Sequence, residues 1–416
     1  MQYLELTAPT GTLKGEIFLP GSKSISNRLL IIQALAGVQV NFENLSISDD
    51  TLNLQKNLNG DHLIYDVHHA GTNARFLTAF FAFQSGDQII TGSQALKKRP
   101  IEQLVRALNS LGANIEFLEV QGNLPIKIMS PSKSIRNTVQ IDGSISSQYI
   151  SALALVAPTL PKGLTIEITN DLVSSPYLEM TLDVMKLHGI DLMYEYPTIN
   201  IPNQTYCVED AEIEGDWSAA SYFYALCSLM PGTVLQINGL KEDSLQGDRN
   251  LVEIFGKLGV RSIFNEKGVE ISSVEDHVNP PIFEYNFLST PDLFQTVSVV
   301  TAIKDITSIY SGLNTLAAKE TDRFNAMKTE LQKTKVSLFP LPSKFAKKSN
   351  TTFYMQEGMS VIEPNELFLT YEDHRMAMAC SLFSTINSIR IEDPSVVTKS
   401  FPSYWENLEK LGWKVT

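Results

Sequence analysis

Two kinds of helix alternate along the hydrophobic and polar pattern of this chain. The first kind opens on small or polar residues and continues as an almost wholly apolar segment, as in GSKSISNRLLIIQALA from Gly21. A helix that is apolar on nearly every face lies buried inside a domain. We therefore expect buried helices wherever this pattern occurs. The stretches that show it are residues 21–36, 70–83, 142–157, 215–229, 291–303 and 372–384.

The second kind of helix is amphipathic and ends near a glycine, ahead of a β-type run. LVRALNSLGANIEF from Leu104 is an example. The glycine is predicted to cap the helix, and the alternating or β-branched residues after it are predicted to form a strand. Interleaving of the two kinds indicates an internal repeat, three copies in each half, although generic α/β alternation remains an alternative. The other amphipathic stretches begin at Leu182, Leu251 and Tyr404, and weaker ones cover residues 52–64 and 327–339.

Composition places the chain among ordinary globular proteins. It has 416 residues, of which 43% are hydrophobic and 19% are charged, and this length predicts two or three domains. The longest apolar run, residues 149–160, is interrupted by Pro158 and is too short to span a bilayer. We therefore expect a soluble protein without a targeting segment.

Charge and cysteine content exclude several classes of function. The net charge of −13 argues against nucleic acid or an anionic membrane as a partner, because both require a basic surface. Cys207, Cys227 and Cys380 form neither a CxxC motif nor a Cys/His cluster, so we expect no disulfide framework and no zinc site. A reducing compartment, the cytoplasm, is the expected location.

Charged residues gather at the N-terminal ends of the apolar helices. Lys23 and Arg28 open the first, Arg75 lies in the second, and Asp373 and Arg375 open the last. The N-terminus of a helix presents unpaired N–H groups and the positive end of the helix dipole. The pattern predicts a receptor for phosphate and carboxylate groups.

A series of short motifs resembles the 5-enolpyruvylshikimate-3-phosphate synthase family. The motifs occur in the family's order along almost the whole chain, which makes a chance match negligible. They are PGSKSISNR at 20–28, AGTNARFL at 70–77, KKRPIEQLVRAL at 97–108, DGSISSQYISAL at 142–153, LVSSPY at 172–177, SLQGD at 244–248, TPD at 290–292, AKETDR at 318–323, EDHRMAMA at 372–379 and KSFPSYW at 399–405.

The resemblance implies an α/β (α+β) fold, a two-lobed inside-out α/β barrel. Each lobe would hold three pseudo-threefold repeats with buried helices behind small sheets. Residues 1–20 and 215–416 would form a discontinuous lobe with the catalytic carboxylates and part of the phosphoenolpyruvate site. Residues 21–214 would form the second lobe, with the shikimate 3-phosphate site and the rest of the phosphoenolpyruvate site. Hinges near residues 20–21 and 214–216 would absorb the rotation of lobe closure.

The activity implied by the resemblance is transfer of the enolpyruvyl group of phosphoenolpyruvate to the 5-hydroxyl of shikimate 3-phosphate, with release of phosphate. The catalytic residues would be Asp292 as base at the hydroxyl, Glu320 as acid at the methylene carbon, and Lys23 as an aid to either proton transfer. No cofactor and no metal is implied, and His374 has no second ligand at metal-binding spacing. We expect a monomer whose partners are these two small substrates.

The resemblance also assigns the residues that bind each substrate. Hydroxyl groups can form hydrogen bonds with phosphate without adding charge, whereas the guanidinium of arginine can donate two parallel hydrogen bonds to a phosphate or carboxylate. Capping serines and surface ion pairs are the structural alternatives. The shikimate 3-phosphate set is Lys23, Ser24, Arg28, Ser146, Ser147, Gln148, Ser174, Tyr177, Asp292 and Lys319, and the phosphoenolpyruvate set is Lys23, Gly71, Arg99, Gln148, Arg323, Arg375 and Lys399.

The chain departs from the family's pattern beside the phosphoenolpyruvate set. His69 stands where the family usually has asparagine, so substrate affinity or its pH dependence is expected to differ. Gly71 is the small residue that leaves room for glyphosate in this family, which predicts sensitivity to that inhibitor.

Two other functions remain open at this point. A related enolpyruvyl transferase acts on UDP-N-acetylglucosamine, but that family carries a loop cysteine in its first large lobe, and no cysteine precedes Cys207 here. A non-catalytic anion-binding paralogue would be expected to lose Asp292 or Glu320, and both are present.

Overall fold

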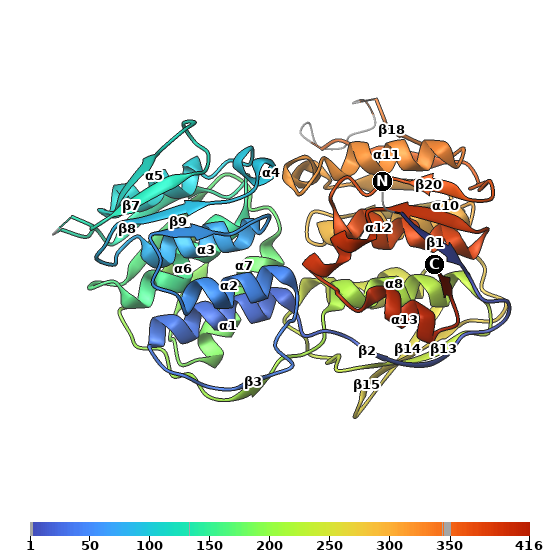
Figure 1. The fold of residues 1–416 in the computed structure, drawn as a ribbon, viewed down its shortest axis with the longest axis horizontal. Coiled ribbons are helices and arrows are strands. Elements are labelled where there is room, and N and C mark those ends of the chain that lie inside the picture. The colour runs from blue at the N-terminus through green and yellow to red at the C-terminus, as the bar shows by residue number, and fades with distance from the viewer. Residues whose placement is uncertain (1–2, 133, 343, 345–350) are drawn as a thin grey trace. The chain divides into compact units, whose positions relative to one another are not determined.

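The computed structural model describes residues 3–132, 134–342, 344 and 351–416. The chain forms two compact units. One, here called the terminal unit, comprises Met1–Gly21 and Glu214–Thr416, and the other, the inserted unit, comprises Ser22–Ile213. Figure 1 labels the elements of both.

Helices and strands alternate throughout the inserted unit. They are α1 (Lys23–Ala36), β3 (Phe42–Glu43), α2 (Asp49–Leu58), β4 (Ile64–Asp66), α3 (Gly71–Phe81), β5 (Gln88–Thr91), α4 (Gln94–Lys97), α5 (Glu102–Leu111), β6 (Asn114–Phe117), β7 (Ile126–Met129), β8 (Thr138–Asp142), α6 (Ser147–Val156), β9 (Leu164–Thr169), α7 (Ser175–Leu187), β10 (Met193–Glu195), β11 (Thr198–Ile201) and β12 (Ala211–Glu212).

The terminal unit repeats the same alternation. Its strands are β1 (Tyr3–Thr7), β2 (Lys14–Phe18), β13 (Val234–Asn238), β14 (Val260–Asn265), β15 (Gly268–Ser273), β16 (Phe283–Asn286), β17 (Ser308–Ser311), β18 (Ser337–Pro340), β19 (Tyr354–Glu357), β20 (Glu366–Phe368), β21 (Ile389–Glu392) and β22 (Lys414–Val415). Its helices are α8 (Trp217–Leu229), α9 (Leu251–Gly256), α10 (Phe294–Ile303), α11 (Arg323–Lys333), α12 (His374–Ser381) and α13 (Tyr404–Lys410).

One sheet pattern recurs five times in the described residues. In the sheet β4-β5-β7-β6, the parallel strands β4 and β5 are joined through α3, and the hairpin β6–β7 follows α5 and pairs antiparallel with β5. The sheets β8-β9-β11-β10, β2-β13-β15-β14, β16-β17-β19-β18 and β20-β21-β1-β22 have the same pattern of parallel and antiparallel pairs. The repeat is reduced once, because β3 and β12 form only a two-stranded parallel ribbon.

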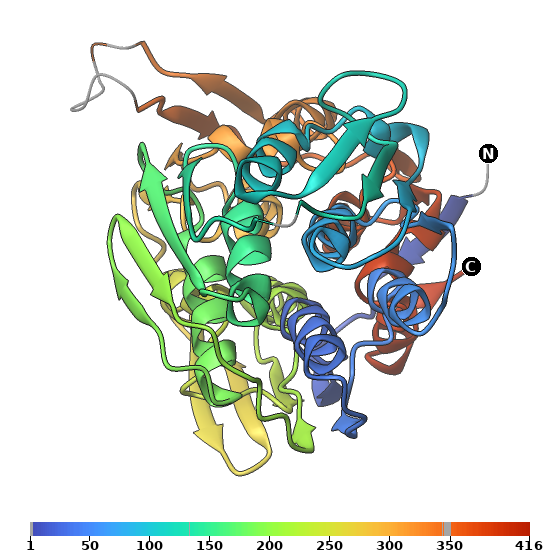
Figure 2. The ribbon, with the colours of Figure 1, turned by 90° about the vertical axis from the view of Figure 1, so that its left-hand side faces the viewer.

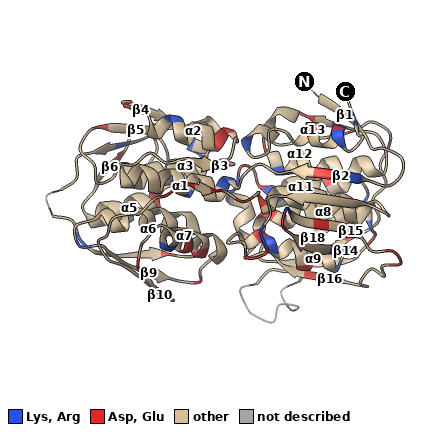
Figure 3. Ribbon diagram, turned by 90° about the horizontal axis from the view of Figure 1, so that it is seen from below, with Lys and Arg blue, Asp and Glu red and all other residues tan. Residues whose placement is uncertain are grey.

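The apolar helices form the core of each unit, as the sequence pattern predicts. In the inserted unit α1, α3 and α6 pack together, and Figure 2 shows these helices in the view turned by 90° from Figure 1. In the terminal unit α10 packs against α8 and α12. Helices α6, α8 and α10 contain no Lys, Arg, Asp or Glu, the residues coloured in Figure 3. The six predicted buried helices are therefore confirmed.

The predicted capping glycine directly follows one amphipathic helix, but after three others it lies further along the chain. Gly112 directly follows α5 in the left-handed conformation, with φ of 113°. After α7, α9 and α13 the helix ends earlier, and Gly189, Gly259 and Gly412 adopt positive φ within the turn that leads to the next strand. Glycine is still required there, because positive φ is unfavourable for residues with a Cβ.

Within the described ranges, no helix combines the length and the apolar character needed to cross a membrane.

Candidate functional site

Arg323 is the centre of a buried ionic cluster in the terminal unit. Its Nη1 donates to Oδ1 of Asp292 at 2.8 Å, its Nη2 to Oε2 of Glu320 at 2.9 Å, and its Nε to Oδ2 of Asp373 at 2.7 Å. The side chain is 2% exposed. Burial alone would lower the pKa of Arg323, but Asp373, Glu320 and Asp292 raise it. The guanidinium is thus a permanent cation that fixes three carboxylates.

Asp292 collects further positive charge. Nη2 of Arg375 lies 2.9 Å from its Oδ2, and Nζ of Lys319 lies 3.5 Å from its Oδ1. Burial would raise the pKa of Asp292, but the charges of Arg375, Lys319 and Arg323 outweigh burial and hold it well below the usual value. Asp292 is therefore ionised throughout the neutral range.

Glu320 is bridged between two cations from different elements. Oε2 accepts from Arg323, and Oε1 lies 3.1 Å from Nζ of Lys399, which is buried. Lys399 closes a short 3-10 turn that starts at Pro394, far from Glu320 along the chain. The fold thus brings together every residue that the sequence assigned to the terminal unit: Asp292, Lys319, Glu320, Arg323, Arg375 and Lys399.

The ends of three helices place these side chains. Asp292 lies in the 3-10 turn Pro291–Leu293, directly before α10, and Arg323 is the first residue of α11. Asp373 is the N-cap of α12, where its side chain accepts from the backbone N–H of Arg375 at 2.9 Å. A helix start faces its unpaired N–H groups and its positive dipole end toward the cluster, which favours anions there.

The inserted unit brings the starts of α1, α3 and α6 together. Nδ2 of Asn27 donates to Oδ1 of Asn73 at 3.3 Å, which joins α1 to α3. Nε2 of Gln148 donates to Oγ1 of Thr72 at 3.2 Å, which joins α6 to α3. Lys23, the first residue of α1, forms an ion pair with Asp50 at 3.1 Å.

Gly71 opens α3 between two guanidinium groups. A Cβ built at Gly71 would lie 2.4 Å from Nη1 of Arg75 and 2.9 Å from Nη1 of Arg99, so both cations reach the backbone at the start of the helix. Arg75 is 6% exposed, its guanidinium lies over the ring of Tyr149, and its Nε and Nη1 have no hydrogen-bond partner in the described structure. Arg75 was noted as a charge at a buried helix but was not assigned to a substrate.

The predicted serines lie at helix starts. Ser146 is the N-cap of α6 and accepts from the N–H of Gln148 at 3.3 Å, with Ser147 next to it. Ser174 precedes α7 in the left-handed conformation and makes no side-chain capping bond. Helix capping therefore explains the serine at position 146 but not the serine at position 174. Ser174 is buried, and its left-handed backbone conformation is uncommon for a residue other than glycine.

Arg28 is tied to the protein itself. Its Nε donates to Oγ1 of Thr181 at 2.7 Å, its Nη1 to the carbonyl of Ser24 at 2.8 Å and its Nη2 to the carbonyl of Tyr177 at 2.9 Å. Burial lowers the pKa of Arg28 to about 10. These bonds join α1 to α7, so Arg28 positions Ser24 and Tyr177 whatever it contributes to a ligand.

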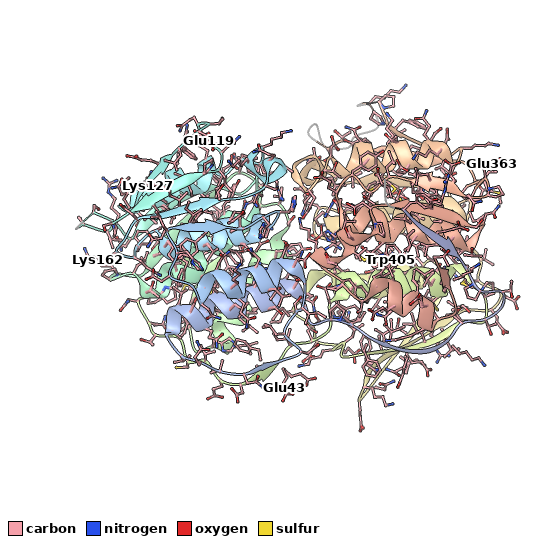
Figure 4. The ribbon with its side chains drawn as sticks, viewed as in Figure 1. Glu43, Glu119, Lys127, Lys162, Glu363 and Trp405 are labelled. Carbon is pink, nitrogen blue, oxygen red and sulfur yellow. The ribbon has the colours of Figure 1, made fainter. Side chains whose placement is uncertain are left out.

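Three further residues of the candidate site were not assigned to it from the sequence. Asp50 pairs with Lys23, Asp373 orients Arg323, and Asp248 lies close enough for the charges of Asp292 and Arg375 to act on it. For two of them the signal in the sequence was position within the motifs, because Asp373 follows Glu372 in EDHR and Asp248 ends SLQGD, whereas Asp50 lies outside the motifs. Other charged residues outside the motifs lie at the surface: Glu119, Lys162 and Glu363 are exposed and point outward (Figure 4).

Two further observations concern His69 and metal binding. Nδ1 of His69 lies 3.0 Å from Oγ of Ser93, on an exposed surface two residues before Gly71. Among the residues that the structure describes, no three or more His, Cys, Asp and Glu side chains are arranged to hold a metal ion.

Comparison with known proteins gives a consistent result over the whole chain. The sequence matches the family EPSP synthase (3-phosphoshikimate 1-carboxyvinyltransferase) over residues 7–60 and 53–408. The 3-phosphoshikimate 1-carboxyvinyltransferase of Bacteroides fragilis is 38% identical over 418 residues, covering 100% of this chain and 99% of the relative. That of Colwellia psychrerythraea is 33% identical and covers 99% and 100%.

Solved structures agree on the fold. The EPSP synthase of Acinetobacter baumannii superimposes with a TM-score of 0.77 at 18% identity, covering 100% of both chains. The enolpyruvyl transferase NikO of Streptomyces tendae gives a TM-score of 0.73 at 13% identity, covering 100% of this chain and 98% of NikO. The predicted two-lobed α/β fold is confirmed, and the chain belongs to the EPSP synthase (3-phosphoshikimate 1-carboxyvinyltransferase) family.

Proposed function

We propose that this protein transfers the enolpyruvyl group of phosphoenolpyruvate to the 5-hydroxyl of shikimate 3-phosphate, with release of phosphate. The single observation that carries the proposal is the buried cluster in which Arg323 holds Asp292 and Glu320 together. Addition across a carbon–carbon double bond needs a base at the attacking hydroxyl and an acid at the receiving carbon. Two carboxylates fixed on one guanidinium supply that pair.

Asp292 is the proposed base at the 5-hydroxyl. Without substrate its three cations hold it ionised but make it a weak base. A substrate phosphate or carboxylate competes for Arg375 and Lys319, and loss of those contacts raises the pKa of Asp292. Arrival of the substrates thus makes Asp292 more basic at the moment when a proton must be removed.

Glu320 is the proposed acid that protonates the methylene carbon and later accepts a proton back. The tetrahedral intermediate then expels phosphate, which takes up the proton that Asp292 removed, as Glu320 regains its own proton from the methyl group and the carbon–carbon double bond re-forms. Lys399 and Arg323 flank Glu320 and stabilise the negative charge that it carries between the two steps.

We propose that the substrates are bound by the residues that the family motifs match. Arg323, Arg375 and Lys399 of the terminal unit, with Lys23, Gly71, Arg99 and Gln148 of the inserted unit, bind phosphoenolpyruvate. Lys23, Ser24, Arg28, Ser146, Ser147, Gln148, Ser174 and Tyr177, with Asp292 and Lys319, bind shikimate 3-phosphate. Arginine matches phosphate and carboxylate geometry with paired N–H donors.

The test is phosphate release by the purified protein from phosphoenolpyruvate and shikimate 3-phosphate, with a chelator present. UDP-N-acetylglucosamine serves as a parallel acceptor. Release with shikimate 3-phosphate alone is expected, and Asp292→Asn and Glu320→Gln should each lower kcat by about 10²- to 10⁴-fold. Turnover of the nucleotide sugar instead, or no turnover with either acceptor, would reject the proposal.

We further propose a cytoplasmic monomer that needs no cofactor. Cys207, Cys227 and Cys380 are free thiols in the structure, which suits a reducing compartment. Light scattering during size-exclusion chromatography, with and without substrates, tests the oligomeric state.

A further inference from the structure

Glu330 is a buried carboxylate that the proposed reaction does not use. It lies on α11, about two turns after Arg323. Its Oε1 accepts a hydrogen bond from the hydroxyl of Tyr371 at 2.6 Å. Its Oε2 accepts from the backbone N–H of Leu369 at 3.1 Å and from Nζ of Lys333 at 2.7 Å. Glu330 thus ties α11 to the segment that leads into α12.

Lys333 strengthens this tie from the next turn of α11. Its Nζ also donates to the carbonyl of Leu367 at 2.9 Å and lies 5.8 Å from the centroid of the Phe368 ring. Both of these residues belong to β20. Because a buried carboxylate is costly unless it is paired and hydrogen-bonded, the ammonium of Lys333 also keeps Glu330 in place. The two side chains therefore anchor residues 367–371 to α11.

The segment that Glu330 holds contains a turn of uncommon backbone conformation. Tyr371 and Glu372 have φ of 54° and 56°, in the left-handed region that residues with a Cβ seldom occupy. The N–H of Asp373 closes the turn by donating to the carbonyl of Thr370 at 2.9 Å. Conformations of this kind persist only where the surrounding structure fixes them. The hydrogen bond from Tyr371 to Glu330 supplies such a constraint.

The turn sets the position of the residues that open α12. Oδ2 of Asp373 accepts from Nε of Arg323 at 2.7 Å, and its Oδ1 accepts from the N–H of Arg375 at 2.9 Å. Nη2 of Arg375 in turn donates to Asp292 at 2.9 Å. Because residues seven apart lie on the same face of a helix, Arg323 and Glu330 hold one segment from the same face of α11.

We propose that Glu330 is a positioning residue, which holds the left-handed turn before α12 and thereby directs Asp373 and Arg375 into the ionic cluster. The inference rests on the role proposed above for Arg375 in binding phosphoenolpyruvate. Without the bond between Glu330 and Tyr371, the turn can adopt the more common conformations with negative φ. The start of α12 then shifts, and the guanidinium of Arg375 shifts with it.

The first test compares Tyr371→Phe with the matched control Tyr224→Phe. Each substitution removes one hydrogen-bonded hydroxyl from the terminal unit, and that of Tyr224 bonds to Ser262 on β14 at 3.0 Å. KM for phosphoenolpyruvate should rise about tenfold in Tyr371→Phe, because a small misplacement of a binding group is costly. It should stay near the parent value in Tyr224→Phe. An equal KM in the two variants would overturn the proposal, because the hydroxyl of Tyr371 would then serve stability alone.

Two further variants test whether the turn is what Glu330 holds. Glu330→Gln keeps the size of the side chain but places an amide donor where a carboxylate oxygen accepts, so KM should rise at least as much as in Tyr371→Phe. Glu372→Gly, added to Tyr371→Phe, removes the Cβ of an exposed left-handed residue. Glycine adopts positive φ without steric cost, so KM should return toward the parent value. Failure of the added glycine to lower KM would overturn the proposal.

Hydrogen exchange keeps the inference separate from the proposed reaction, because it needs no substrate. The backbone N–H groups of Asp373 and Arg375 are hydrogen-bonded within the turn and the helix cap. Their exchange should be faster than in the parent in Tyr371→Phe and unchanged in Tyr224→Phe. Parent-like exchange in Tyr371→Phe would overturn the proposal. Faster exchange in that variant, with no turnover of phosphoenolpyruvate by the parent, would uphold the role of Glu330 in the turn and reject the proposed reaction alone.

Discussion

Arg323 and Asp373 form an ion pair in the interior of the terminal unit, with Nε 2.7 Å from Oδ2 and the side chains 2% and 0% exposed. The same carboxylate caps α12 by accepting from the N–H of Arg375. One side chain therefore fixes both the start of a buried helix and the orientation of the guanidinium that holds Asp292 and Glu320.

Replacing Asp373 with asparagine should destabilise the protein by about 3–5 kcal/mol, the usual cost of breaking a buried ion pair. Asparagine can still cap α12, but Arg323 loses the charge that compensates its burial. The free energy of unfolding in urea measures the effect. Glu372→Gln is the control, since Glu372 is exposed and should change stability by at most about 0.5 kcal/mol. Equal stability of the two variants would show that the pair does not stabilise the fold.

Lys319 should limit activity at alkaline pH. Burial lowers its pKa from the ordinary lysine value of 10.5, although Asp292 acts in the opposite direction. A lysine with a lowered pKa is charged below that pKa and neutral above it, so binding of shikimate 3-phosphate should weaken before an ordinary lysine would titrate. Lys319→Arg keeps its charge at high pH and should move the alkaline limb of kcat/KM upward. Lys328→Arg, an exposed replacement of the same kind, should leave the limb in place.

A methyl group at Gly71 should disturb phosphoenolpyruvate binding more than folding. The added Cβ would approach Arg75 and Arg99 to 2.4 and 2.9 Å, and both side chains must shift. A displaced guanidinium loses paired contacts with an anion, so KM for phosphoenolpyruvate should rise about tenfold or more in Gly71→Ala. Gly256→Ala is the matched control, because a Cβ there meets nothing within 4 Å. A similar KM in both variants would show that Gly71 and its two neighbouring arginines do not contribute to phosphoenolpyruvate binding.

Glyphosate is expected to inhibit the enzyme in competition with phosphoenolpyruvate, because a glycine at the position of Gly71 leaves room for the inhibitor in this family, and a Cβ there would meet Arg75 and Arg99. Gly71→Ala should raise the inhibitor concentration needed for half inhibition more than it raises KM for the substrate. His69→Asn tests whether the neighbouring imidazole, which contacts Ser93, modifies this response. An inhibition curve that stays flat to millimolar glyphosate would contradict the expectation.

The sequence predicts the fold well because hydrophobic pattern and turn residues act locally. Each buried helix was visible as an apolar run, and Gly112 ends α5 where its left-handed conformation is needed. Helix ends at α9 and α13 were less predictable, because packing against the following strand decides how many turns form. The two-stranded ribbon of β3 and β12 was not predictable either, since it pairs segments from opposite ends of the inserted unit.

The site was predictable as a set of residue types but not as a set of contacts. Motifs identified the cations and the two proton-transfer carboxylates. They did not show that Asp373 orients Arg323, or that Asp248 shares a neighbourhood with Arg375. Those relationships join residues far apart along the chain. Arg323 meets Asp373 because α11 packs against α12, and the turn that carries Asp248 packs against α8.

Substitutions at Arg28 can distinguish a role in binding shikimate 3-phosphate from a role in stabilising the inserted unit. Three of its donors are bonded to Thr181, Ser24 and Tyr177 inside the inserted unit. Lysine cannot reproduce that fork, so Arg28→Lys should lower stability by about 1–3 kcal/mol through the acceptors left unpaired and should also raise KM for shikimate 3-phosphate. Urea unfolding and substrate titration measure the two effects.

Thr181→Val is the control that tells the two roles of Arg28 apart. It removes the acceptor for Nε and leaves the charge of Arg28 in place, so it should destabilise the unit to a comparable extent. If Arg28 contacts the phosphate, KM for shikimate 3-phosphate should rise several-fold more in Arg28→Lys than in Thr181→Val at equal loss of stability. If KM rises equally in both, Arg28 acts by holding α1 against α7, and binding belongs to the groups that it positions, Ser24 and Tyr177.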